Sequence, residues 1–88
     1  MKSGSIEFGG ENINFIESKF IMCSINIIFS INEYPLLFML SEDLSDLKLH
    51  LSESKPSWIT VYRNARIDKI TIDDVDSTFT ASFKLHVV

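Results

Sequence analysis

The sequence predicts a mainly β domain, built as a single antiparallel sheet or a small barrel or sandwich of about six or seven strands. Two segments, residues 20–31 and 78–87, are apolar at every second position, which is typical of strands with one face on a core. Turn-forming residues such as Gly9-Gly10 separate the apolar runs. A length of 88 residues allows one domain, so we expect residues 1–88 to form a single globular unit.

Residues 20–31 are predicted to form the central strand of the sheet. β-branched and aromatic residues dominate the alternating row and fit a pleated surface. The row predicted to face the core consists of Ile21, Cys23, Ile25, Ile27, Phe29 and Ile31. Cys23 is the only cysteine, so it cannot form an internal disulfide, and we expect it to be a small buried hydrophobic residue.

The N-terminal twenty residues predict two shorter strands. Residues 5–8 form an edge-strand candidate, and Gly9-Gly10 forms a turn. Residues 12–20 form the return strand, in which Ile16 interrupts the alternation and suggests a bulge or burial on both sides. Residues 17–19 are polar and predict either a tight turn or a bend within a continuous strand.

The middle of the chain is predicted to hold one short helix. Pro35 ends the preceding strand, and residues 36–40 form either a strand buried on both faces or a lead into a helix. Residues 42–51 favour the helix, because Ser41 is a capping residue, Glu42 and Asp43 suit a first turn, and leucines recur on one helical face. The alternation of Leu47, Leu49 and Leu51 supports a strand instead.

The C-terminal third predicts three strands joined by turns. Residues 57–63 and 67–72 form two of them, and residues 63–66 form a turn in which Asn64 tolerates a left-handed backbone. Residues 73–77 form an acidic turn before the strand at 78–87, whose inner face would carry Phe79, Ala81, Phe83, Leu85 and Val87. This order of elements resembles the plan of a small five-stranded oligonucleotide/oligosaccharide-binding (OB) barrel.

Composition and motifs disfavour several classes of function. Twelve acidic and eight basic residues give a net charge of −4, which disfavours duplex nucleic acid and anionic membranes. Residues 20–40 alternate and contain polar positions, so we expect no membrane span, and without a secretory signal we expect a cytoplasmic protein. His50 and His86 have no ligand-type neighbours, and no nucleophile elbow or glycine-rich phosphate loop is present. We therefore expect no cofactor, no metal site and no enzymatic activity.

Of the classes of function considered, the one that the sequence favours is binding to another protein chain. A small acidic domain suits an inhibitor or immunity-type protein that occludes a partner macromolecule by complementarity of charge and shape. The candidate binding residues are acids on two predicted turns and two aromatic residues on one strand. They are Asp73, Asp74 and Asp76, then Glu42 and Asp43, and finally Trp58 and Tyr62. The apolar residues Phe20, Met22 and Ile28 and the run 36–40 are expected to include surface that another chain covers.

Two alternatives belong to other classes of protein. The first is a small structural or assembly subunit that forms homo-oligomers through sheet edges, with residues 5–8 or 78–87 as the pairing strands. The second is an OB-like domain for single-stranded nucleic acid, suggested by Arg63, Arg66 and Lys69 beside Trp58 and Tyr62. Neighbouring aspartates dilute that positive charge, so the sequence disfavours nucleic acid as the partner.

Overall fold

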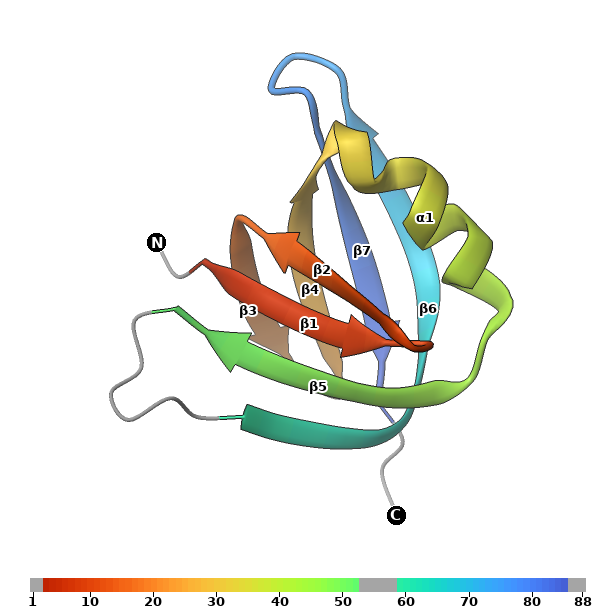
Figure 1. Cartoon of the computed structure of the whole chain (residues 1–88). Coiled ribbons are helices and arrows are strands. Elements are labelled where there is room, and N and C mark those ends of the chain that lie inside the picture. Colours follow the sequence, from red (N-terminus) through yellow and green to blue (C-terminus); the bar gives the residue numbers. More distant parts are fainter. Residues whose placement is uncertain (1–2, 53–58, 86–88) are drawn as a thin grey trace.

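The computed structural model describes residues 3–52 and 59–85, and in these residues seven strands form one antiparallel sheet (Figure 1). The strand order in the sheet is β2-β1-β5-β6-β7-β4-β3. The strands are β1 (Gly4–Phe8), β2 (Glu11–Phe15), β3 (Glu17–Ile21), β4 (Ser24–Ser30), β5 (Ser45–Leu51), β6 (Ile59–Asp73) and β7 (Thr78–Lys84). The prediction of a mainly β, antiparallel domain with one short helix is confirmed.

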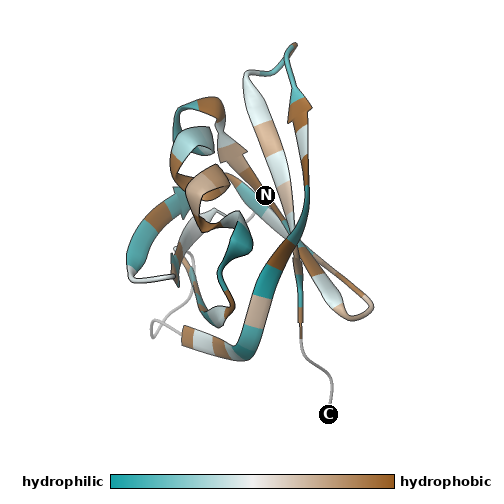
Figure 2. Ribbon diagram, turned by 90° about the vertical axis from the view of Figure 1, so that its right-hand side faces the viewer, coloured by the Kyte–Doolittle hydropathy of each residue, from teal (hydrophilic) through white to brown (hydrophobic). Residues whose placement is uncertain are grey.

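Two bent segments fold the sheet around a common interior. The two end strands β2 and β3 follow each other in the chain, and the bend between them is held by a 2.8 Å hydrogen bond from the Ile16 N–H to the Ile28 carbonyl. The long strand β6 bends in the same way, pairing with β5 up to Ala65 and with β7 from Arg66 onward (Figure 2). Both halves of the sheet therefore direct one face toward the same core.

Irregularities in β6 produce its bend. The register with β5 shifts next to Asn64, which has φ +54°, and the register with β7 shifts at Asp68. Such bulges bend a strand and let it pass from one packed layer to the next. Residues 63–66 were predicted to form a turn, and that prediction is wrong, because they lie inside β6. The expected left-handed conformation of Asn64 is confirmed.

The core consists of the inward rows of both halves of the sheet. Phe8 and Phe83 meet edge to face with ring centroids 5.2 Å apart, and Phe29 stacks on Phe79 at 5.3 Å. Aromatic rings supply much of the buried area in a core this small. The predicted inward rows of the two alternating segments are confirmed at Ile25, Ile27, Phe29, Phe79, Ala81, Phe83 and Leu85. Val87 lies outside the described residues.

The short helix α1 (Tyr34–Met39) lies across one end of the sheet, between the 3-10 turns η1 (Ile31–Glu33) and η2 (Leu40–Glu42) (Figure 1). The preceding turn η1 is capped by the Ser30 hydroxyl, which accepts a hydrogen bond from the Asn32 N–H at 3.4 Å. Pro35 occupies the first turn, where its missing N–H has no consequence. Leu37 and Leu40 are buried and anchor the helix to the core.

The predicted position of the helix, residues 42–51, is wrong. Residues 45–51 form β5, which pairs with β1 and β6 and buries Leu47 and Leu49. The intrinsic preference of leucine and lysine for helix is outweighed by these cross-strand contacts. The helix lies one segment upstream, in the apolar run that was predicted to be either a strand or a lead into a helix.

The prediction of one central strand over residues 20–31 is also wrong. A turn at Met22-Cys23, with Met22 at φ +53°, divides the segment into β3 and β4, and β4 lies next to the end strand β3. Ile21 faces Ser24 across this hairpin, so the odd-numbered inward row of β4 does not continue into β3. Cys23 is exposed in the turn, contrary to the expectation that it is buried.

Neither predicted edge strand lies at an edge. β1 pairs with both β2 and β5, and β7 pairs with both β6 and β4, because the hairpin partners and the long β6 cover their sides. The resemblance to an OB barrel does not extend to the number of strands, since the described residues form seven rather than five.

Candidate protein-binding surface

The outer side of α1 carries large apolar residues that the fold leaves exposed. Phe38 is 61% exposed and Met39 is 73% exposed, whereas the adjacent Leu37 is completely buried. Pro35, one turn earlier, is also exposed. A helix whose residues are nearly all apolar cannot bury every side against a single core, so part of its surface must face outward.

A groove of about 420 Å³ separates α1 and η2 from strand β6. Tyr34 and Phe38 line its helical side, and residues 67–70 line its strand side. Tyr34 stacks on Phe38 at 5.9 Å and meets Phe79 of the core edge to face at 5.5 Å, which holds this aromatic wall in place. The apolar surface of the helix thus continues into a concave site rather than forming an isolated patch.

Acidic residues lie at both ends of the helix. Glu42 and Asp43 follow α1 directly and are exposed. At the other end, a 2.9 Å hydrogen bond from the Ile31 N–H to the Ser77 carbonyl brings the acidic β6–β7 turn close to the start of the helical segment. The resulting surface has an apolar centre and acidic ends, and it contains both of the acidic groups that were predicted as binding residues.

The acids of the β6–β7 turn have different roles. One oxygen of the Asp73 carboxylate accepts hydrogen bonds from the N–H groups of Val75 and Asp76, at 3.0 and 3.2 Å, and so stabilises the turn. The side chains of Asp74 and Asp76 are exposed, and Val75 between them is 92% exposed. Asp74 and Asp76 are therefore the residues of this group that are free to meet a partner.

The predicted aromatic residues do not join this surface. Tyr62 lies opposite Leu47 on the inward face of β6 and contacts Phe20 of β3, with ring centroids 5.9 Å apart. Trp58 lies outside the described residues. Phe38 and Met39 belong to the run 36–40, which was expected to include apolar surface covered by another chain, although the sequence did not single out these two residues.

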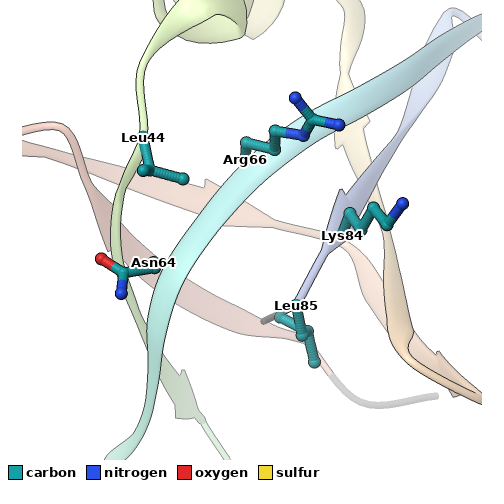
Figure 3. A pocket seen from close by; sticks show the side chains of 5 residues that line it. All are labelled: Leu44, Asn64, Arg66, Lys84 and Leu85. Carbon is teal, nitrogen blue, oxygen red and sulfur yellow. The ribbon is translucent and has the colours of Figure 1, made fainter. Parts of the chain in front are cut away.

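Arg66 and Lys84 lie at a separate place, where β6 bends (Figure 3), whereas Lys69 lines the groove beside α1. Arg66 faces Lys84 directly across the β6–β7 ladder, and Leu44, Asn64 and Leu85 complete a shallow hollow around them. Arg63 lies 3.7 Å from the Asp46 carboxylate. Because Tyr62 points into the core, the described residues do not bring these cations and aromatic rings together as single-stranded nucleic-acid binding would require.

The described part of the chain contains no cluster of three or more side chains suited to hold a metal ion. His50 is half-buried on β5, and His86 lies outside the described residues. Among the described helices, none has the length and apolar character needed to cross a membrane.

Comparison with known proteins found no matching family model, no matching curated protein and no matching solved structure. The contacts, burial and charge of the surface around α1 are therefore the basis for assigning a role.

Proposed function

We propose that this chain is a non-enzymatic protein-binding module that acts as a small inhibitor or immunity-type protein, covering a basic surface of its partner with the side that carries α1. The supporting observation is the exposure of Phe38 and Met39 on a helix that Leu37 and Leu40 anchor to the core. Exposed aromatic residues and methionine are enriched in the centres of protein interfaces, where they bury large areas.

Charge gives this surface its preference for a basic partner. Glu42 and Asp43 at one end and Asp74 and Asp76 at the other would attract basic residues placed around an apolar contact. Such peripheral charges mainly raise the association rate and select the partner, while the buried apolar centre supplies most of the affinity. Inhibition by coverage requires no catalytic group on this chain.

The first test is capture of a partner from the native host by the immobilised chain, compared with a double variant, Phe38→Ser with Met39→Ser. The matched control is Ile21→Ser, which removes an exposed apolar side chain from β3 at a distance from the helix. We expect a stoichiometric partner with the wild type and the control, and its loss with the double variant. Equal recovery by all three proteins would refute a contact through α1.

Homo-oligomerisation is a second candidate, and the hairpin of β3 and β4 favours it. β3 is an end strand, and Phe20 and Met22 at its hairpin end are exposed. An apolar, unpaired strand edge promotes pairing with a second copy. Light scattering on the purified chain distinguishes the candidates: a dimer that Phe20→Ser converts to monomer supports assembly, and a monomer of about 10 kDa supports the heteromeric role.

A further inference from the structure

The second half of β6 has a free edge, and its hydrogen-bonding pattern follows from one bond. The Leu85 N–H donates to the Cys23 carbonyl at 2.9 Å, so the backbone groups of Leu85 point toward β4. Backbone groups alternate in direction along a strand, so those of Phe83 and Ala81 point toward β4 as well. Thr80 and Ser82 consequently direct theirs toward β6, where they pair with Thr71 and Lys69. The N–H and C=O groups of Ile70 and Ile72 must then point to the opposite edge of β6.

That edge has no strand beside it within the described residues. β5 pairs with β6 only as far as Ala65, and β7 occupies the other side. No hydrogen bond from another described residue reaches the outward backbone groups of Ile70 or Ile72. Ile72 is also 47% exposed, although its side chain lies on the inward face opposite Phe79.

The groove beside α1 follows this same edge. It is lined by Ile67 and Ile70, whose side chains belong to the inward face of β6, and also by Lys69, which lies opposite Ser82 on the outward face. A hollow that touches residues from both faces of a strand must lie along its edge. The free backbone groups of Ile70 therefore border a concave site whose other wall is Tyr34 and Phe38, and those of Ile72 lie two residues further along the same edge.

We propose that this edge accepts an extended segment of the partner as an additional strand, with apolar side chains toward the groove and basic residues at its ends. The backbone groups of Ile70 and Ile72 would supply main-chain hydrogen bonds, and the aromatic wall would select apolar side chains at alternate positions. Asp68 lies at one end of this edge and Asp74 at the other, with Lys69 between them, so the two ends favour basic residues of the partner.

The acidic flanks also argue against a second copy of the chain in this place. Between positions 68 and 74 this edge carries three aspartates and one lysine, Lys69, so pairing two β6 edges would bring two net negative segments together. Like charges placed opposite each other destabilise strand pairs. The inference depends on the proposed function, since it specifies how a partner would bind at the same side of the molecule.

In the test, a synthetic peptide, acetyl-Lys-Val-Thr-Val-Thr-Val-Lys-amide, is added to the isotopically labelled full-length chain. Binding is monitored by NMR chemical shifts and by amide hydrogen exchange. In the free protein, the amides of Lys69 and Thr71 should be protected and those of Ile70 and Ile72 should exchange rapidly. We expect the peptide to protect the amides of Ile70 and Ile72. A peptide with Glu in place of both Lys residues should bind about tenfold more weakly.

Two substitutions at position 72 distinguish the contribution of the backbone N–H to peptide binding from that of the side chain. Ile72→Pro removes the outward N–H without removing a bond to β7, and Ile72→Ala shortens the side chain but keeps the N–H. After both variants are shown to fold by circular dichroism, we expect the proline variant to bind the peptide about tenfold more weakly than the alanine variant. Equal affinities, or peptide-induced shifts on β2 or β3 instead, would overturn the proposal.

Failure here is distinguishable from failure of the proposed function. Ile21→Ser changes an exposed side chain of β3 that does not line the groove, so it should leave peptide binding unchanged. If partner capture depends on Phe38 and Met39 while the peptide leaves Ile70 and Ile72 unprotected, the strand-addition inference is wrong and the binding role stands. If the peptide protects Ile70 and Ile72 but no captured partner depends on Phe38 and Met39, the strand-addition inference stands and the binding role of α1 is wrong.

Discussion

Asn64 illustrates how a single residue controls the path of a long strand. Its left-handed backbone lies at the register shift between β5 and β6, and its N–H donates to the Asp46 carboxylate at 3.2 Å. Asparagine adopts this conformation more readily than other residues with a side chain, because its short amide forms local hydrogen bonds. The bend of β6 therefore depends on a residue whose role is conformational.

We predict that Asn64→Val lowers the free energy of unfolding by about 1–2 kcal/mol, because a β-branched residue is strained at positive φ. Asn64→Gly should change it by only a few tenths of a kcal/mol, since glycine adopts this backbone freely. Urea titration followed by circular dichroism measures both. If valine and glycine had equal effects, the strain at this position would not contribute to stability.

Gly4 is required for the close approach of β1 and β5. A Cβ atom at this position would lie 2.0 Å from the carbonyl oxygen of His50, a distance that the paired backbones can relieve only by moving apart. We predict that Gly4→Ala destabilises the fold by about 3 kcal/mol. Gly10→Asn is the control, because no atom lies within 4 Å of a Cβ there and asparagine tolerates positive φ, so a loss below about 1 kcal/mol is expected in thermal unfolding.

At the scale of the element, α1 has a buried side that anchors it to the core and an exposed apolar side. A helix of six residues is not stable alone, so its tertiary contacts decide whether it forms. Leu37 is completely buried, and Met39, two positions later, is mostly exposed. Substitutions at Leu37 and Met39 therefore compare a buried and an exposed position within one turn of the same helix.

We predict that Leu37→Ala destabilises the protein by about 3 kcal/mol through the lost apolar contacts and the resulting cavity. Met39→Ala should change stability by less than about 0.5 kcal/mol while weakening partner binding. Chemical denaturation and binding measurements on the same samples separate the effects. A large loss of stability with Met39→Ala would show that its side chain supports the fold rather than an interface.

Strands were predictable from the sequence where alternation and burial coincided, as in β4 and β7. The segment 45–51 was assigned to the wrong element because its leucines satisfy both a helical and an extended spacing. Only the pairing of β5 with β1 and β6, which are distant in sequence, decides between them. The turn at Met22-Cys23 was missed for a related reason, since neither residue is a typical former of left-handed turns.

The charged parts of the candidate binding surface were predictable residue by residue, and its apolar part only as a run. The acids at positions 42, 43 and 73–76 stand out in the sequence, and the structure brings them to the two ends of α1. The run 36–40 was expected to include apolar surface for another chain, but which of its residues are exposed depends on the side of the helix that the core occupies. The free edge of β6 could not be inferred at all, since it follows from the order of strands.

At the scale of the whole molecule, β6 belongs to both halves of the sheet, and the bend at Ile16 joins the two end strands. The buried residues of both halves form one continuous core. Neither half can therefore separate without breaking contacts of the other. Small single domains with one core usually unfold in a single cooperative transition.

We predict that Leu49→Ala in β5 and Phe83→Leu in β7 each lower the urea midpoint equally for probes placed in either half. Residue-resolved NMR intensities during titration provide those probes. Because every region is coupled through β6, all amide signals should follow one curve in each variant. Two separate midpoints, one for β1 and β5 and another for β4 and β7, would contradict this coupling.

The separation of buried and exposed side chains within α1 has a consequence for evolution. Leu37 and Leu40 hold the helix in place, so substitutions at positions 35, 38 and 39 are almost free of selection for folding. Lineages could exchange these side chains rapidly as a target protein diverges, while the scaffold beneath them is conserved. Related sequences should vary most at these outward positions and least at the two leucines.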